Sequence, residues 1–354
     1  MNLSNSSGQR PTDPSESRRI FSALPKTEMH LHIEGAISLN EYRKVADVPA
    51  DWTAPGWAPN YRYETFKEFE DFILGYADNW FISPERYRES AKSLFERKLA
   101  EGVRYMECSF AGIVCQTKQL PIDEVVDAIQ SVVPPGLEVR IFIGLHHDGW
   151  IPQTERSLTD LLSFNRLDGI DLHGPEGYPV RDWMLDYWPA ARAAGKFTKA
   201  HAGELGGAWH VREAIEKLGV RRIEHGIRAI EDPEVLQLLI DHKVVLDVCP
   251  ISNFKLKSVE SYAKHPLSQL ITAGVVCTIN TDDPFIFGNT IIDEFTVLAT
   301  EAGFDTKALL QLARNGFEHA LVSDSLRQQM LEEFDTSAKA LLNSADQQSH
   351  RHEF

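Results

Sequence analysis

Apolar residues recur along this chain in a regular order: a segment with the spacing of one helix face precedes a short, continuous apolar run. Residues 85–101 have the spacing of a helix that ends at Gly102, and residues 103–110 are typical of a strand. The same order repeats to residue 279. Further strands are predicted at residues 137–145, 167–172, 197–200, 221–224, 244–248 and 275–279.

An apolar run that reaches His30 supplies one more strand, which brings the number to eight. Helices are indicated between the strands, for example after Asp232-Pro233, an N-cap followed by proline at the first helical position. Eight strands alternating with helices predict an α/β fold, a closed parallel (β/α)8 barrel of the TIM type with extra helices. The expected organisation is a disordered tail over residues 1–20, a single barrel over residues 21–342 and a polar tail over residues 343–354.

Composition limits the possible partners. The chain has 354 residues, 43% of them hydrophobic, and a formal net charge of -16, which disfavours nucleic acid and anionic membrane surfaces. No run approaches the roughly 20 apolar residues of a membrane span, and the first residues lack the apolar region of a signal peptide. Four unpaired cysteines favour a reducing, cytoplasmic location. A small-molecule substrate is expected, and the oligomeric state is left open.

Two histidines, His30 and His32, stand two residues apart at the end of the first strand. Alternate side chains of an extended strand leave on the same face, so both imidazoles can reach one metal ion. Taken alone the pattern is weak, because histidine pairs also occur in loops and in hydrogen-bonded cores.

The other predicted strand ends add more candidates. In a (β/α)8 barrel the chemistry gathers at the carboxyl ends of the strands, where this chain has His201-Ala202-Gly203-Glu204, Glu224-His225-Gly226 and Thr281-Asp282-Asp283-Pro284. Three histidines and a carboxylate form a donor set that suits Zn²⁺. Glu204 is then free to donate or accept a proton, and His225 can orient or deprotonate a metal-bound water. The predicted ligands of one zinc ion are His30, His32, His201 and Asp282.

Five motifs in this order resemble the adenosine deaminase family of the amidohydrolase superfamily. They begin at Met29, His201, His225, Cys249 and Thr281, and read MHLHIEG, HAGE, HG, CPISN and TDDP. The resemblance covers about residues 24–321. It implies zinc-dependent hydrolytic deamination of an aminopurine nucleoside, with adenosine converted to inosine and ammonia.

The resemblance also implies roles for single residues. Glu204 protonates N1 of the purine, while a water activated by the metal and oriented by His225 attacks C6. Asp283 contacts that water or the N7 side of the ring; a helix N-cap before Pro284 is the alternative for this residue. Cys249 and Asn253 are expected to shape the turn after the seventh strand.

Substrate contacts follow from the same resemblance. Gly174 offers its backbone N–H to the purine, and an apolar helix covers the ring with Phe66, Phe69 and Ile73; a helix that packs only on the core is the alternative. Glu34 stands where adenosine deaminases have an aspartate for the ribose 5'-hydroxyl, and adenine deaminases have glutamate there.

Several functions therefore stay open. Adenosine is the expected substrate, with adenine and the 5'-extended nucleoside aminodeoxyfutalosine as alternatives. Outside the family, another metal-dependent amidohydrolase, such as an esterase or lactonase, or an inactive metal-binding barrel are the competing hypotheses.

Overall fold

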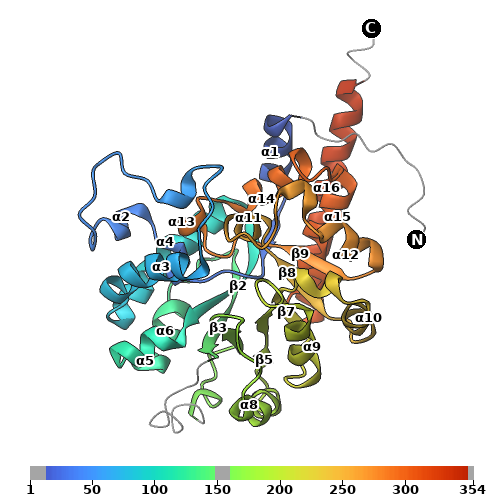
Figure 1. Cartoon of the computed structure of the whole chain (residues 1–354). Coiled ribbons are helices and arrows are strands. Elements are labelled where there is room, and N and C mark those ends of the chain that lie inside the picture. Colours follow the sequence, from blue (N-terminus) through green and yellow to red (C-terminus); the bar gives the residue numbers. More distant parts are fainter. Residues whose placement is uncertain (1–12, 148–159, 350–354) are drawn as a thin grey trace.

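The computed structural model describes residues 13–147 and 160–349 (Figure 1). Strands occupy the centre of the molecule and helices surround them. The strands form two sheets, in the orders β1-β2-β3-β4-β5 and β6-β7-β8-β9, and each pairing is parallel. Their bounds are β1 (Lys26–Glu28), β2 (Val103–Ala111), β3 (Glu138–His146), β4 (Gly169–His173), β5 (Phe197–Thr198), β6 (Ala200–Ala202), β7 (Arg222–His225), β8 (Val245–Val248) and β9 (Val276–Ile279).

The two sheets join at both seams and close into one (β/α)8 barrel, as predicted. At one seam, the backbone N–H of Lys199, between β5 and β6, donates to the Ile170 carbonyl of β4 at 2.9 Å. At the other seam, Leu31 bridges Asp282, whose carbonyl accepts from the His32 N–H at 3.1 Å. The predicted fifth strand is divided into β5 and β6 because β5 pairs with β4 whereas β6 pairs with β7.

The first strand is shorter than expected. β1 ends at Glu28, and His30 lies in a bend rather than in the regular strand. Beyond β1 the backbone still runs between β2 and the end of β9, because the Ser109 N–H donates to Leu31 and the Asp282 N–H donates to His30. This pairing on both sides keeps the two histidines directed toward the barrel mouth although the ladder is irregular.

The predicted helices are present in the described residues, most with bounds shifted by one to four residues. α3 begins after Thr65, which accepts from the Glu68 N–H, and α10 begins after Asp232 with proline at its first position. Up to residue 216, the α-helices within the described residues are α1 (Pro14–Ala23), α2 (Leu39–Tyr42), α3 (Phe66–Trp80), α4 (Pro84–Ala100), α5 (Gly112–Lys118), α6 (Ile122–Gln130), α8 (Asp182–Ala193) and α9 (Ala208–Glu216). The others are α10 (Pro233–Asp241), α11 (Pro250–Lys255), α12 (Leu267–Ala273), α13 (Pro284–Phe287), α14 (Ile291–Thr300), α15 (Thr306–Glu318) and α16 (Asp324–Ser349).

Helices extend into both predicted tails. Asp13 caps α1, and this helix packs on α14, where the Phe21 ring stacks on Phe295 with centroids 4.7 Å apart. The buried pair Ile20 and Phe21 stabilises the helix, so the tail expected over residues 1–20 is wrong from Asp13 onward. At the other end α16 continues to Ser349, beyond the boundary expected at residue 342. Residues 1–12 and 350–354 lie outside the described residues.

Within residues 13–147 and 160–349, none of the helices combines the length and the apolar character that crossing a bilayer requires.

Candidate active site

The four predicted metal ligands meet at the carboxyl end of the barrel. Nε2 of His32 lies 3.2 Å from Nε2 of His30 and 3.3 Å from Nε2 of His201. Oδ1 of Asp282 lies 3.3 Å from Nε2 of His30 and 3.1 Å from Nε2 of His32. Donor atoms around a tetrahedral ion with bonds of about 2.0–2.1 Å stand about 3.3 Å apart. These contacts therefore fit a single ion of the size of zinc.

The ring nitrogen that faces away from this centre has a partner in each of the three histidines. Nδ1 of His32 lies 2.9 Å from Oγ of Ser109, and Nδ1 of His201 lies 3.0 Å from the Leu172 carbonyl. Nδ1 of His30 lies 3.2 Å from the Asp247 carbonyl, which has hydrogen-bond geometry, and 3.0 Å from a carboxylate oxygen of Glu224 in an ion-pair contact. A hydrogen bond at Nδ1 leaves the Nε2 lone pair free for a metal and fixes the orientation of the ring.

A second donor set shares most of these residues. His30, His201 and Asp282 together with His225 also offer ligand atoms within 4.8 Å of one another. The two sets differ only in the choice of His32 or His225. His225 Nε2 lies 3.8 Å from Asp282, whereas His32 Nε2 lies 3.1 Å from it, so the shorter contact favours the set with His32.

Two of these residues adopt a backbone conformation that side chains rarely take. His225 has φ of +65° and Asp282 has φ of +63°, both at the ends of strands. Left-handed backbone in a non-glycine residue costs free energy, and it is concentrated at functional sites where the surrounding structure imposes it. The strain therefore agrees with a site role for both residues.

Glu204 lies beside His225 in the site. Oε2 of Glu204 is 3.5 Å from Nε2 of His225, and Oε1 accepts from Nδ2 of Asn253 at 3.3 Å. Burial, with the nearby charges of Asp282 and Glu176, raises the pKa of Glu204 well above its ordinary value. A raised pKa favours the protonated form of this carboxyl group, which is the form that can donate a proton to a bound base.

His225 is placed to accept a proton rather than to donate one. Burial lowers the pKa of this imidazole well below its ordinary value, and the neighbouring His30 adds to the effect. Nδ2 of Asn253 lies 3.1 Å from Nδ1 of His225 and holds the ring so that Nε2 faces Glu204 and Asp282. Asn253 thus contacts both Glu204 and His225, a role that the sequence interpretation of this residue missed.

Asp283 does not cap the helix that follows it. Its side chain makes no capping hydrogen bond to α13, and Oδ1 is buried without a hydrogen-bond partner in the described part of the chain. Burial and the charge of Asp282 raise the pKa of this carboxyl well above its ordinary value. A buried polar atom without a partner, on the wall of a cavity, is suited to contact a ligand.

The position of Asp283 depends on Gly35. A Cβ at Gly35 would lie 1.6 Å from Oδ1, 2.4 Å from Cγ and 2.6 Å from Cβ of Asp283. The whole Asp283 side chain would have to move. We expect Gly35→Ala to cost about 1–3 kcal/mol of unfolding free energy through overpacking, and to lower kcat/KM.

Thermal unfolding and steady-state kinetics check this prediction. Gly75→Ala in α3 is the control, because no heavy atom lies within 4 Å of its Cβ position. Alanine there should raise the unfolding free energy by up to about 1 kcal/mol through its helix propensity. A Gly35→Ala protein with wild-type stability and kcat/KM would contradict the tight packing against Asp283.

A cavity of about 230 Å³ opens over these groups. α3 covers one side of it, and Phe69 of this helix also stacks on Phe287 at 5.6 Å, so the helix both packs on the core and lines the cavity. The predicted site residues that line it are His32, Glu34, Phe66, Phe69, Ile73, Gly174, His201, Glu204, His225, Asp282 and Asp283. Of the predicted site residues, only His30 does not line the cavity.

Gly174 and Glu34 each have close neighbours within the protein. Gly174 has φ of +98°, and a Cβ there would lie 2.6 Å from Nε2 of His146, so the close neighbour of the glycine is a protein ring. Oε1 of Glu34 accepts from the Tyr87 hydroxyl at 2.7 Å and from the Ala111 N–H at 2.9 Å. Both residues still line the cavity.

Sequence reasoning missed several residues that support the site. Glu176 accepts the backbone N–H groups of residues 204, 205 and 206 at 2.5–3.0 Å and so fixes the turn that carries Glu204. His146 lines the cavity from the end of β3. Both residues follow predicted strands, and this position is the feature of the sequence that could have indicated a role in the site.

Comparison with known proteins agrees with this geometry. The family model described as adenosine deaminase matches residues 25–337. This chain belongs to the adenosine deaminase family. It is therefore an enzyme, a hydrolase that acts on C–N bonds.

Relatives named adenine deaminase and relatives named adenosine deaminase are equally similar in sequence to this chain. An adenine deaminase of Streptomyces coelicolor is 32% identical over 85% of this chain and 91% of its own length. An adenosine deaminase of Klebsiella pneumoniae is also 32% identical, over 86% and 96%. The crystal structure of an adenine deaminase from Arthrobacter aurescens superposes with a TM-score of 0.80 at 26% identity, covering 89% of this chain and 99% of that one.

Proposed function

We propose that this deaminase removes the 6-amino group of an aminopurine by zinc-dependent hydrolysis, with adenosine converted to inosine and ammonia. The observation that carries the proposal is the convergence of the four ligand groups beside Glu204 and His225 in one cavity. The donor set of three imidazoles and one carboxylate suits Zn²⁺. When bound, zinc supplies Lewis-acid activation of a water molecule at neutral pH.

The residues of the chain supply the rest of the chemistry. An aromatic amine is a poor electrophile, so the protonated carboxyl of Glu204 donates a proton to N1 and makes C6 accept a nucleophile. His225, neutral because its pKa is lowered, orients the attacking water and accepts a proton from it. The carboxyl group of Asp283, which lines the cavity, contacts the water or the N7 side of the ring.

The apolar wall of the cavity binds the base. Phe66, Phe69 and Ile73 cover the ring from α3, which buries an aromatic surface and keeps bulk water away from the reacting groups. Glu34 and Gly174 line the same cavity and complete the proposed substrate contacts. The net charge of -16 agrees with an uncharged, small-molecule substrate.

Adenine is the second candidate substrate, and Glu34 favours it. This residue matches the glutamate of adenine deaminases, and Tyr87 and Ala111 already hold one of its carboxylate oxygens. The motif that contains Gly174 resembles the nucleoside deaminases and so favours adenosine, but His146 occupies the space beside this glycine, which weakens that argument.

A substrate panel tests the proposal. Purified, zinc-loaded protein is mixed with adenosine, adenine and aminodeoxyfutalosine in turn, and the ultraviolet absorbance of the aminopurine and the released ammonia are both followed. We expect kcat/KM to be highest for adenosine. A higher value for adenine would replace adenosine by the second candidate, and absence of ammonia from all three would refute the proposed deamination.

A further inference from the structure

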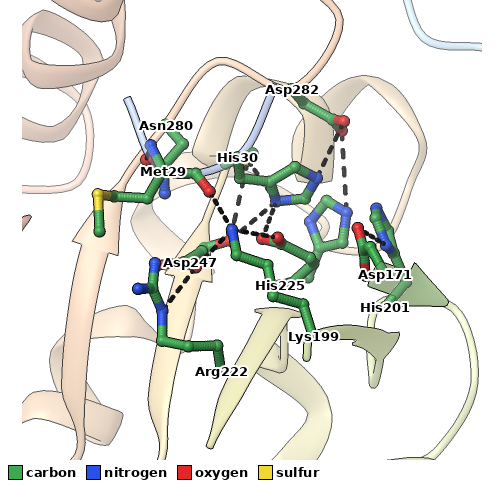
Figure 2. A network of polar contacts seen from close by, with 12 residues as sticks. Met29, His30, Asp171, Lys199, His201, Arg222, His225, Asp247, Asn280 and Asp282 are labelled. Atoms are coloured by element: carbon green, nitrogen blue, oxygen red, sulfur yellow. Dashed lines mark hydrogen bonds and ion pairs between the residues drawn. The ribbon is translucent and has the colours of Figure 1, made fainter. Parts of the chain in front are cut away.

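A group of buried charges lies directly beneath the proposed metal site, and the mechanism does not use it. Lys199, between β5 and β6, places Nζ 2.7 Å from Glu107 of β2 and 2.9 Å from Glu224 of β7. Arg222 places a guanidinium nitrogen 2.6 Å from Asp247 of β8 and 3.3 Å from Glu107. All five side chains are buried, and Figure 2 shows the Lys199 ammonium between His30 and the Arg222–Asp247 pair.

This group reaches His30 by two routes. The Glu224 carboxylate accepts from Lys199 through Oε1, and its Oε2 lies 3.0 Å from Nδ1 of His30. Lys199 also donates to the Met29 carbonyl, the backbone group just before His30, at 2.5 Å. One ammonium group therefore holds both the carboxylate that faces the His30 ring and the backbone that carries this histidine.

This buried group carries one more negative than positive charge, and one of its carboxylates faces the metal site. Three carboxylates (Glu107, Glu224, Asp247) face two cations (Lys199, Arg222), and Glu224 is the carboxylate that turns its second oxygen to a ring nitrogen rather than to a cation. Buried ion pairs seldom stabilise a fold more than apolar residues of the same volume. A negative group behind a ligand imidazole makes that ligand more basic and compensates part of the charge of a bound dication.

We propose that Glu224, held by Lys199, is a positioning residue that fixes the orientation of the His30 ring with hydrogen on Nδ1 and Nε2 toward the metal. The proposal rests on the proposed function, since it requires a metal at this site. It does not depend on the choice between His32 and His225, because His30 contacts His32 at 3.2 Å and Asp282 at 3.3 Å and also belongs to the donor set with His225.

The test measures metal binding rather than activity. Apo-protein is titrated with Zn²⁺ against a chromophoric chelator, and the visible spectrum of the Co²⁺-loaded protein reports the ligand geometry. We expect Glu224→Gln to raise the zinc Kd by about 10–100-fold and to shift the cobalt spectrum. The effect is bounded because the Asp247 carbonyl, 3.2 Å from Nδ1 of His30, remains as an acceptor.

Two further variants separate positioning from general loss of stability. Tyr105→Phe removes a hydrogen bond to the far side of Glu107 at 2.7 Å, so it should lower Tm and leave the zinc Kd unchanged. The double variant Lys199→Met with Glu224→Gln removes one positive and one negative charge together, so it should unfold at a higher temperature than Lys199→Met alone and still bind zinc weakly.

The outcomes distinguish the inference from the function on which it rests. Wild-type zinc affinity and an unchanged cobalt spectrum in Glu224→Gln and in the double variant would overturn the positioning role alone. A wild-type protein that binds no stoichiometric zinc would overturn the proposed function, and this inference with it.

Discussion

Glu204→Gln is expected to lower kcat by on the order of 10² or more while the zinc content stays at one ion per chain. Glutamine keeps the size of the side chain and can still accept from Asn253, which lies 3.3 Å from Oε1. It has no acidic proton to give to the purine ring. None of the short contacts between the proposed ligands involves Glu204, so the metal site should be preserved.

Metal analysis and steady-state kinetics on the same preparation check this prediction. Glu41→Gln is the matched control, because Glu41 is also a buried glutamate but caps α2 and bonds to Ser90, and it is absent from the cavity lining. The control should retain wild-type kcat. Near-wild-type turnover in Glu204→Gln would remove this residue from the mechanism.

The raised pKa of Glu204 adds a dependence on pH. The carboxyl group donates a proton only while it is protonated, so its contribution to kcat is present below its raised pKa and is lost as the pH rises through that value. We expect wild-type kcat to fall on the alkaline side, and Glu204→Gln to lack this fall. Rate profiles over pH for both proteins, with zinc occupancy measured at each pH, make the comparison.

Hydrophobic periodicity was sufficient to predict the barrel. β2, β3 and β4 each begin and end within two residues of the expected strands, because continuous apolar runs between helices with clear caps are typical of buried parallel strands. The division at Lys199 could not be predicted, since it depends on which neighbours β5 and β6 pair with. α1 was missed because a polar N-terminal segment buries only the few apolar residues at its end, such as Phe21.

The candidate site was predictable for a related reason. Residues at the ends of parallel strands meet at one face of a barrel however far apart they are in sequence, so the order of the strands is enough to group His30, His201 and Asp282. Their supporting partners could not be predicted in this way. Lys199 and Arg222 look like ordinary charged residues within short predicted strands, and the closed barrel is needed to show that they are buried against Glu107 and Asp247.

His201→Ala is expected to abolish stoichiometric zinc binding and, with it, deamination. Nε2 of His201 lies 3.3 Å from Nε2 of His32, and its Nδ1 is fixed by the Leu172 carbonyl at 3.0 Å, so the substitution removes a ring nitrogen that is held in position for the ion. Zinc content after gel filtration through metal-free buffer and the rate of ammonia release are the two measurements. Wild-type protein stripped with a chelator should be inactive in the same way and recover when zinc is returned.

His319→Ala is the control for loss of a histidine, because His319 lies at the end of α15 and is absent from the cavity lining; it should keep one zinc ion per chain. His32→Ala and His225→Ala then decide between the two donor sets. If His32 is a ligand, as its 3.1 Å contact with Asp282 favours, His32→Ala loses zinc whereas His225→Ala keeps zinc and loses turnover. The reverse pattern would make His225 the ligand and leave the attacking water without the base proposed for it, and zinc retained by His201→Ala would contradict both sets.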